Sequence, residues 1–559
     1  MLRVLIVLAV FLTGSAGLAV GISTQWWWLA ILGCLVILAS FLGVYDLIQT
    51  HHSITRNYPI LGHMRFWIEH IRPEVRQYFI ESNTDGMPFD RETRDLVYDR
   101  AKGNHGEEPF GTQRDVNAAD YEFVAHSLRA KPKPDTPAPR VRLGGPQCSK
   151  PYDIALLNVS AMSFGSLSGN AIAALNGGAA RGGFAHDTGE GSVSRYHTQY
   201  GGDLIMEVAS GYFGCRTPDG RFDGEKFAER AQLDQVKAIN LKISQGAKPG
   251  LGGLLPGAKV NADVAEARGV EIGTTVVSPP AHSTFTTPLE LIDFIDELRE
   301  LSGGKPVGFK ICIGSRREFL AIAKAMVARN STPDFIIVDG SEGGTGAAPV
   351  EFEDHVGMPL TEALMFVHNA LVGVGVRDRI KIGASGKIAT GIDIVKRICQ
   401  GADFTLSARA MMFAVGCIQA QACHTNACPT GVATQDPARA RALVVPDKIE
   451  RVYQYQKHTV DSARQIVASM GLDSFGQLNP HKLLRRIDAQ HTMTYGDLYD
   501  WLTPRQLLTE PPLSWQRDWR EAAADTFEPD SHRNATAHAM NRSVIEWQRP
   551  SLDDPMPVH

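Results

Sequence analysis

The stretch that decides the fold is Asp334-Phe335-Ile336-Ile337-Val338-Asp339-Gly340-Ser341-Glu342-Gly343-Gly344-Thr345-Gly346-Ala347. It begins with a short apolar run between two aspartates and continues into a turn rich in glycine. An apolar run of this length is typical of a parallel strand that is buried on both faces. Glycines directly after such a strand let backbone N–H groups approach a phosphate closely. This stretch therefore predicts a buried strand followed by an anion-binding loop.

Seven further runs of this kind alternate with helical or irregular segments. Pro288–Ser302 and Arg316–Arg329 have the apolar spacing of amphipathic helices. Strand–helix alternation indicates a parallel sheet, and eight repeats over about 280 residues indicate an α/β fold of the TIM-like (β/α)8 barrel type. Seven or nine strands fit the same spacing, because predicted strand ends drift by about 2–4 residues. The predicted strands are Asp153–Asn158, Gly183–Asp187, Ile239–Ile243, Thr274–Ser278, Val307–Ile313, Asp334–Asp339, Ile380–Ala384 and Asp403–Ser407.

The next two predicted strands end in a similar way. One leads into Ser385-Gly386-Lys387 and the other into Ala408-Arg409. A phosphate site in the loops after the last strands is common in this fold, and an arginine there can bind phosphate through two hydrogen bonds. A single loop of this kind is more often only a tight turn. Three consecutive strand ends favour a phosphate-binding site.

Lysines end two of the predicted strands. Lys310 lies in the last part of the fifth, where a fixed cation would stabilise a reduced, anionic flavin. The alternative is a buried structural lysine, which is costly unless it is paired. Lys242 and Lys248 flank the end of the third and precede the glycine-rich segment Leu251–Gly257. Two such lysines can bind a dicarboxylate, although lysines in solvent are the commoner case.

Three cysteines form a compact motif, Cys417-x5-Cys423-x4-Cys428, followed by Pro429. This spacing is typical of an iron–sulfur cluster bound by thiolates. Zinc fits less well, because no fourth cysteine lies nearby, although His424 is available. A chance group of reduced core cysteines is the remaining alternative. Three ligands favour a three-iron cluster, and a cluster beside a phosphate cofactor indicates an electron-transfer enzyme.

The N-terminal region contains two apolar stretches, Val4–Ile22 and Trp26–Val44. Each is close to the roughly 20 residues that a helix needs to cross a bilayer. They predict a transmembrane helical hairpin at residues 4–44, with a tryptophan cluster at one interface. The alternative is a signal peptide followed by a soluble protein. The positive-inside rule then predicts an inner-membrane protein with two spans and a cytoplasmic catalytic domain, from the arginines Arg3, Arg56, Arg65 and Arg72.

Composition narrows the class of protein further. The chain has 56 basic and 61 acidic residues, so it lacks the basic excess of a nucleic-acid-binding protein. We predict five parts: the hairpin at 1–50, a helical region with a proline-rich linker at 51–140, the barrel with the cysteine motif at 141–436, a helical extension at 437–510 and a polar tail at 511–559. Within the flanking parts we predict the helices His63–Ile71, Pro73–Ile80, Arg91–Ala101, Asp447–Met470 and Pro504–Leu508, with Thr503 as the N-cap of the last and a loosely ordered tail at Ser531–His559.

Taken together, these residues resemble the FMN-binding glutamate synthase family, as a membrane-anchored branch that consists of the synthase part. The resemblance covers about residues 150–475. It rests on these segments: Met162–Ser168, Thr188–Gly191, Ser210–Gly214, Lys242–Gly257, Ser278–Pro280, Gly343–Pro349 and Cys417–Gln435.

The resemblance implies a barrel with FMN and a 3Fe–4S cluster that converts 2-oxoglutarate and ammonia, through 2-iminoglutarate, into L-glutamate. The cluster ligands implied are Cys417, Cys423 and Cys428. The residues implied around FMN are Met162, Ser163, Gly165, Lys310, Gly343, Gly344, Ser385, Gly386, Lys387 and Arg409. The residues implied for catalysis are Glu190, Lys242 and Lys248, and those implied for binding the 2-oxo acid are Ser244, Lys248 and Arg268.

Two departures from the family pattern affect these expectations. Family members of full length begin with a glutaminase domain whose nucleophile is an N-terminal cysteine, whereas residue 2 here is leucine and the apolar hairpin follows. We therefore expect ammonia from solution or from a separate glutaminase. Leu254 stands where the family usually has glutamine, so a related 2-oxo acid is also a candidate substrate. No strand-linked G-x-G-x-x-G nicotinamide site is found, which favours ferredoxin or another electron donor.

Two other functions remain open. An FMN-dependent 2-hydroxy-acid or amino-acid dehydrogenase would use a histidine as base, with His186 and His282 as candidates, but it gives the cysteine motif no purpose. A non-catalytic, membrane-bound electron carrier would hold the same cofactors without a substrate.

Overall fold

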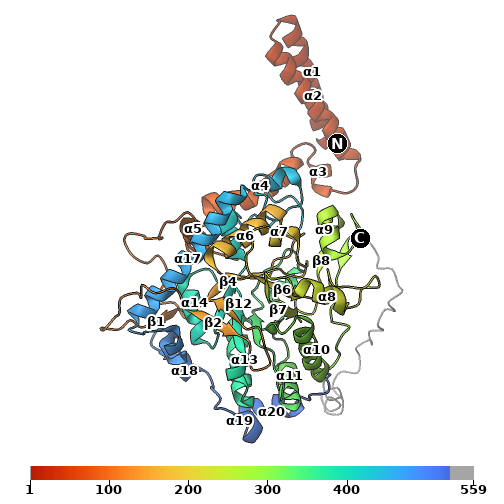
Figure 1. The fold of residues 1–559 in the computed structure, drawn as a ribbon. Helices are drawn as coiled ribbons and strands as arrows, with labels where there is room; N and C mark the ends of the chain where they lie inside the picture. The colour runs from red at the N-terminus through yellow and green to blue at the C-terminus, as the bar shows by residue number, and fades with distance from the viewer. Residues whose placement is uncertain (1, 529–559) are drawn as a thin grey trace, which may run out of the picture. The chain divides into compact units, whose positions relative to one another are not determined.

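The computed structural model describes residues 2–528, and the predicted tail at Ser531–His559 lies outside them. The chain divides into two compact units, and the division falls between Arg91 and Glu92. The first unit is helical and begins with the long antiparallel pair α1 (Leu2–Ser23) and α2 (Trp27–Ile48) (Figure 1). It continues with α3 (Ser53–Asn57), α4 (Gly62–Val75) and the π-helix η1 (Arg76–Ile80).

Helices α1 and α2 pack closely because small residues line their contact. A Cβ atom at Gly21 would overlap the backbone of Ala30, and one at Gly33 would overlap the backbone of Leu18. The segments Arg3–Ser23 and Trp27–Ile48 are long and apolar enough to cross a membrane. The two predicted apolar helices are therefore confirmed as helices; their membrane role stays a proposal.

The predicted helix break before Pro73 is wrong. Pro73 lies inside α4, and the chain stays helical until it widens into the π-turns of η1. A proline removes one backbone hydrogen bond, and here that loss does not end the helix.

The second unit is built around a closed barrel. Within residues 2–528 eight parallel strands form it, in the order β10-β11-β12-β13-β4-β5-β6-β7. This confirms the predicted α/β class and the eight-stranded TIM-like barrel. The strands are β4 (Leu157–Val159), β5 (His186–Asp187), β6 (Leu204–Val208), β7 (Val236–Lys242), β10 (Val307–Ile311), β11 (Phe335–Asp339), β12 (Lys381–Ser385) and β13 (Phe404–Ser407).

Three predicted strand assignments need correction. Thr274–Ser278 is not a barrel strand: it contains β9 (Val276–Val277), which pairs antiparallel with β8 (Leu254–Leu255) outside the barrel. The missing barrel strand is β6, whose Met206 and Glu207 interrupt the β-branched pattern. The predicted strand Asp153–Asn158 contains two elements, β3 (Tyr152–Ala155) and the start of β4.

Helices cover the outside of the barrel, as the central part of Figure 1 shows. The predicted helices at 288–302 and 316–329 are confirmed as α10 and α11. α10 begins with a capping box, in which Thr287 and Glu290 each bind the other's backbone N–H. The main helices of this layer are α6 (Gly169–Gly182), α8 (Gly224–Ala231), α10 (Pro288–Leu301), α11 (Arg316–Arg329), α13 (Leu360–Val374), α14 (Gly391–Cys399), α15 (Arg409–Val415) and α17 (Val445–Ser469).

A hairpin closes the end of the barrel at which the strands begin. β2 (Arg140–Leu143) pairs antiparallel with β3. Leu143 and Ile154 from this hairpin are fully buried in one apolar cluster with inward-facing barrel residues such as Ile205 and Phe335. The polar end of the barrel is therefore the opposite one, where the strands finish.

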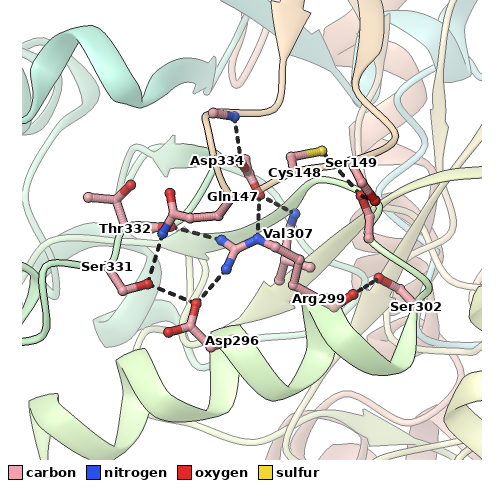
Figure 2. Close-up of polar contacts among 12 residues, drawn as sticks. Gln147, Cys148, Ser149, Asp296, Arg299, Ser302, Val307, Ser331, Thr332 and Asp334 are labelled. Atoms are coloured by element: carbon pink, nitrogen blue, oxygen red, sulfur yellow. Dashed lines mark hydrogen bonds and ion pairs between the residues drawn. The ribbon is translucent and has the colours of Figure 1, made fainter.

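Asp334 anchors the hairpin to the barrel, and Figure 2 shows its surroundings. Its carboxylate accepts hydrogen bonds from the backbone N–H of Gly145 at 2.7 Å and of Val307 at 2.9 Å. Arg299 donates to the same carboxylate at 3.1 Å and to the Thr332 carbonyl at 2.8 Å. One buried ion pair therefore joins the hairpin, β10 and α10.

The chain segments that precede and follow the barrel in the sequence pack on its outside. α17 packs against α6 so closely that a Cβ atom at Gly178 would lie 2.5 Å from the Val452 side chain. The early strand β1 (Glu122–Val124) pairs antiparallel with the late strand β14 (Leu483–Arg486). The shorter elements are α5 (Arg91–Ala101), α7 (Arg195–Thr198), η2 (Gly257–Lys259), α9 (Ala262–Arg268), α12 (Val350–His355), η3 (Arg377–Arg379), α16 (Pro437–Ala440), η4 (Phe475–Gln477), η5 (Pro480–Lys482), β15 (Thr492–Thr494), α18 (Tyr495–Leu498), α19 (Gln506–Thr509) and α20 (Leu513–Glu521).

The C-terminal predictions are confirmed in part. The predicted helix at 447–470 is α17, and that at 91–101 is α5. Thr503 is not an N-cap: α19 begins after Arg505, which has a left-handed backbone. The region after Pro511, predicted to be polar and aperiodic, contains α20, whose Trp515 is buried against Phe366.

Candidate active site

Charged side chains line the barrel at the ends of its strands. Side chains alternate in direction along a strand. Glu207 therefore points into the barrel as Ile205 does in β6, and Asp339 points into it as Ile337 does in β11. In the same way Asp187 ends β5, Lys242 ends β7 and Lys310 lies near the end of β10. Barrel enzymes have their active sites at this end. The mouth is therefore the candidate active site.

The ion pair between Lys242 and Glu190 is the centre of this group. Lys242 Nζ lies 2.8 Å from Glu190 Oε2 and 3.9 Å from Glu207 Oε1. Burial acts to lower the pKa of Lys242, but the two carboxylates outweigh it and raise the pKa above its ordinary value. Burial acts to raise the pKa of Glu190, but Lys242 and Arg268 lower it to about 2. Both members of the pair are thus charged at neutral pH.

Glu207 behaves in the opposite way. Burial raises its pKa to about 8, against the attraction of Lys242. Its Oε2 atom is buried and has no hydrogen-bond partner in the described chain. Burial also raises the pKa of Asp187, which accepts hydrogen bonds from Asn240 at 2.9 Å and from the Gly189 N–H at 3.0 Å. Glu207 therefore holds a proton at neutral pH beside a charged lysine.

Lys310 is paired rather than isolated. Its Nζ lies 3.3 Å from Asp339 Oδ2, which also accepts the Gly246 N–H at 2.8 Å. Burial acts to lower the pKa of Lys310, but Asp339, Glu207 and Asp187 outweigh it and raise the pKa. A permanent positive charge therefore stands at the end of β10.

The segment after β7 folds over the Lys242–Glu190 pair. A Cβ atom at Gly253 would overlap Glu190 Oε1, so a larger residue there would displace the Glu190 carboxylate. Lys248 is buried, and burial lowers its pKa while Glu190 acts to raise it. Ser244 is placed differently from expectation: its hydroxyl donates to the Cys312 carbonyl at 3.1 Å and accepts the Cys312 N–H at 2.9 Å. Leu254, in β8, is 52% exposed.

Arg268 reaches the same place from α9. It is 2% exposed and donates to the Phe164 carbonyl at 3.2 Å, while its Nε atom has no hydrogen-bond partner in the described chain. Burial lowers its pKa, and Glu190 acts to raise it. The structure thus brings together the predicted group Glu190, Lys242, Lys248 and Arg268.

The loop after β4 forms another part of the mouth. Met162 and Ser163 are buried, and the Ser163 hydroxyl donates to Ser166 at 3.0 Å. Gly165 has a φ of +104°, a conformation that strains other residues. A Cβ atom at Gly189 would lie 2.6 Å from the Ser163 nitrogen, so this loop and the one after β5 touch through their backbones.

The loops after β11, β12 and β13 meet as the sequence analysis expects. Arg409 donates to the Glu342 carbonyl at 2.9 Å, and a Cβ atom at Gly344 would lie 2.7 Å from its Nε. Ser385 contacts Ser160 at 3.3 Å between hydroxyl oxygens. Burial lowers the pKa of both Lys387 and Arg409, and Arg409 lowers that of Lys387 further.

The two cations Lys387 and Arg409 lie beside exposed backbone. This arrangement suits a phosphate, because an anion there would offset the repulsion between the two cations. Gly343 approaches Gly246, and Gly386 has a φ of +147°. These residues are suited to hold the phosphate of FMN.

The cysteine loop follows α15. Burial, together with the Cys423 and Cys428 thiols, raises the pKa of the Cys417 thiol to about 12. Burial acts to raise the pKa of Cys428, but N–H groups of Ala433 and its neighbours lower it below its ordinary value. The three thiols are thus close enough to influence one another.

These thiols fit a cluster better than a single ion. Among residues 2–528 no three His, Cys, Asp or Glu side chains are close enough to bind one metal ion. In a three-iron cluster the three thiols need not meet at one atom, because each thiolate binds a different iron atom.

Several residues of the mouth were missed by sequence reasoning. Glu207, Asp187 and Asp339 interact with the predicted lysines, and Asn240 donates to Asp187; none of the four is part of a motif. One signal was available for Glu207, since a charged residue within an apolar run is costly unless it is paired. This signal was overlooked because strand β6 was not predicted.

Fold and site together define a parallel β/α-barrel protein with an ionic site at its mouth. Residues 142–473 match the family model described as the conserved region in glutamate synthase. The chain is 36% identical over 479 residues to the glutamate synthase large subunit-like protein YerD of Bacillus subtilis (strain 168), which covers 78% of this chain and 91% of that protein. The chain therefore belongs to the glutamate synthase family.

Other comparisons are weaker. The archaeal-type glutamate synthase (NADPH) of Thermotoga neapolitana is 33% identical over 324 residues, which are 58% of this chain and 61% of that protein. The chain thus spans about three fifths of that relative's length. A solved structure of a mandelate oxidase variant has a TM-score of 0.40 and 14% identity, covering 76% of this chain and 99% of that one. That likeness carries no argument about function.

Proposed function

We propose that this protein is a glutamate synthase-type oxidoreductase that converts 2-oxoglutarate and ammonia, through 2-iminoglutarate, into L-glutamate. FMN and a 3Fe–4S cluster are its cofactors, and ferredoxin or another electron carrier is its electron donor. The observation that carries the proposal is the group of Lys242, Glu190, Lys248 and Arg268, two of them buried and two mostly buried, at the mouth of a barrel of this family.

The charges of this group suit a dicarboxylate. Three cations surround the single carboxylate Glu190, so two positive charges remain for a substrate with two carboxylates. The unpaired Nε of Arg268 offers a further donor. Leu254 adds an exposed apolar side chain to the covering segment, so other 2-oxo acids belong in the test.

Proton transfer is the second requirement, because imine formation releases water and imine reduction consumes a proton. Glu190 is ionised and can accept a proton, with Lys242 as its partner at 2.8 Å. Glu207 is protonated at neutral pH and can supply one through Lys242, 3.9 Å away. Glu190, Lys242 and Lys248 are thus the proposed catalytic residues, and Ser244 shapes the pocket through Cys312.

The remaining mouth residues would hold the cofactor. Bound FMN supplies the hydride. Gly343, Gly344, Lys387 and Arg409 would hold its phosphate, and Lys310 would offset negative charge on its ring. Met162, Ser163, Gly165, Ser385 and Gly386 would complete the cofactor site, and Cys417, Cys423 and Cys428 would hold the cluster.

The apolar hairpin supports a location at the cell inner membrane. Helices α1 and α2 would cross it, with the catalytic unit in the cytoplasm. The amine source we propose is free ammonia, alone or released by a separate glutaminase.

The alternative dehydrogenase receives less support from the geometry. Both ring nitrogens of His282 are engaged, Nδ1 at 3.1 Å from the Tyr212 hydroxyl and Nε2 at 2.8 Å from the Lys242 carbonyl. Burial lowers the pKa of His282 to about 4 and that of His186 to about 3. The ring nitrogens of His186 have no hydrogen-bond partner in the described chain, but this residue alternates in direction with Asp187 in β5 and its ring lies 5.2 Å from that of His197, so it faces away from the mouth.

Stopped-flow reoxidation of the reduced holoenzyme tests the proposal. Rapid reoxidation by 2-oxoglutarate with ammonia, and not by either alone, is expected. No reoxidation by any 2-oxo acid with ammonia would favour the electron carrier, and reduction of the oxidised enzyme by a 2-hydroxy acid or an amino acid would favour the dehydrogenase. Absence of flavin and iron from the purified protein would refute the cofactor assignment.

A further inference from the structure

Lys259 is a buried lysine that the proposed reaction does not use. It ends the short turn η2 and is 2% exposed. Its Nζ donates to three backbone carbonyls: Ser166 at 3.4 Å, Cys423 at 2.6 Å and Ala433 at 3.2 Å. Ser166 belongs to the loop after β4, and the other two belong to the cysteine loop. One ammonium group therefore ties the cysteine loop to the mouth of the barrel.

The electrostatic surroundings of Lys259 are unusual. It is buried beside the loop that carries Cys423 and Cys428, and one of its acceptors is the Cys423 carbonyl itself. Carbonyl oxygens satisfy its N–H groups, but they carry no net charge. A buried ammonium is costly unless an anion lies close to it. Thiolates at these two cysteines would supply that anion.

A second side chain makes the same connection. Gln435 Nε2 donates to the Gly165 carbonyl at 3.1 Å and to the Leu167 carbonyl at 2.7 Å. The cysteine loop is thus held to the loop after β4 at two points. Lys259 differs from Gln435 in its charge.

We propose that Lys259 is the positioning residue and counter-ion of the iron–sulfur centre: it holds the cysteine loop against the barrel mouth and places a fixed positive charge beside the cluster. This inference rests on the cluster assignment of the proposed function. Reduction adds negative charge to the cluster, and a nearby cation stabilises the reduced form. Lys259 therefore raises the reduction potential of the cluster and leaves that of the flavin nearly unchanged.

The test compares the holoenzyme with the variants Lys259→Met, Lys259→Gln and Lys259→Arg. The matched control is Lys305→Met, because Lys305 is also buried and donates to carbonyls, of Ala231 at 2.6 Å and Leu233 at 2.9 Å, at the opposite end of the barrel. The measurements are iron and sulfide content, the electron paramagnetic resonance spectrum, and the midpoint potentials of cluster and flavin.

The neutral variants should keep the flavin and show a lowered cluster potential, whereas Lys259→Arg and Lys305→Met should keep the native value. Loss of iron from both neutral variants, with retention in Lys259→Arg, would also support the role. An unchanged cluster potential in Lys259→Met or Lys259→Gln would overturn it, as would loss of iron from Lys259→Arg. Absence of iron from the native protein would instead refute the cluster assignment itself.

Discussion

At the scale of residues, the mouth of the barrel holds acidic and basic side chains in close contact. Lys242 and Lys310 are surrounded by Asp187, Glu190, Glu207 and Asp339. Burial and the neighbouring carboxylates oppose the ionisation of Glu207, so it stays protonated at neutral pH. Glu207, with a pKa raised to about 8, is the acid of the group, and Glu190, with a pKa lowered to about 2, is its ionised member. Acid and base roles are thus set by surroundings and not by residue type.

Glu207 makes stability depend on pH. Between its ordinary pKa of 4.5 and its raised pKa of about 8, the folded chain holds a proton that the unfolded chain has released. Stability therefore falls as pH rises through this window. Glu207→Gln should make the fall in Tm between pH 5 and pH 8 shallower, as measured by calorimetry.

The exposed Glu351, on α12, provides the control substitution to glutamine. It should leave the dependence of Tm on pH unchanged. Parallel curves for Glu207→Gln and the native protein would show that Glu207 is ionised in the fold.

Lys248 should contribute to substrate affinity. A hydrogen bond to a charged group contributes about 1.5–3 kcal/mol, so Lys248→Met should raise KM for the 2-oxo acid roughly tenfold to a hundredfold while flavin content stays native. Steady-state kinetics with varied 2-oxo acid measure this. The exposed Lys226→Met is the control, and an unchanged KM in Lys248→Met would remove Lys248 from the binding site.

At the scale of elements, the barrel separates stability from chemistry. The hairpin β2–β3 and the Asp334–Arg299 pair close the end where the strands begin. The charged residues gather at the other end. This division follows from parallel strands, because all of them finish on the same side.

Breaking the closed end should therefore lower stability without affecting the mouth. Asp334→Asn removes the buried carboxylate that pairs with Arg299 and leaves this arginine with its partly exposed partner Asp296. Removing one partner of a buried ion pair costs about 3–5 kcal/mol. We expect a large drop in Tm with unchanged flavin binding. Asp293→Asn removes the exposed partner of Arg329 and should cost about 1 kcal/mol or less. Equal effects of the two variants, seen in chemical denaturation, would contradict the anchoring role of Asp334.

Strand prediction succeeded where apolar runs were unbroken and failed where charge or exposure changed the pattern. β11 reads Phe-Ile-Ile-Val before its aspartate and was predicted correctly. β6 was missed because Glu207 points into a polar interior, which an apolar pattern does not anticipate. β9 was mistaken for a barrel strand because its valines are β-branched, although Val277 is 66% exposed on a covering hairpin. The β-propensity of a residue does not determine whether its strand belongs to the barrel or lies outside it.

At the scale of the whole molecule, the apolar surface of the helical hairpin supports its proposed insertion into a membrane. Helices α1 and α2 present large exposed apolar side chains, such as Leu8 at 51% and Leu35 at 56% exposed. If these face lipid, arginine in place of leucine near the middle of a span costs about 2.5–3.5 kcal/mol per residue.

The double variant Leu8→Arg/Leu35→Arg should accordingly release the protein from membranes on alkaline washing, while the native chain stays bound. Leu513→Arg, at an 87% exposed position of α20, is the control and should stay bound. Fractionation of washed membranes gives the answer, and recovery of the native chain in the wash would argue against the spans.

By itself, the sequence determined the class of fold, the apolar hairpin and the family, because apolar periodicity and contiguous motifs are local properties of the chain. It also determined the lysines at the strand ends and the cysteine spacing. Tertiary structure alone decided which carboxylates face those lysines, that Ser244 binds the Cys312 backbone, and that Lys259 reaches the cysteine loop from more than 150 residues away. The physical reason is that pKa values and ion pairs depend on distances and burial, which arise only when the strands close into a barrel.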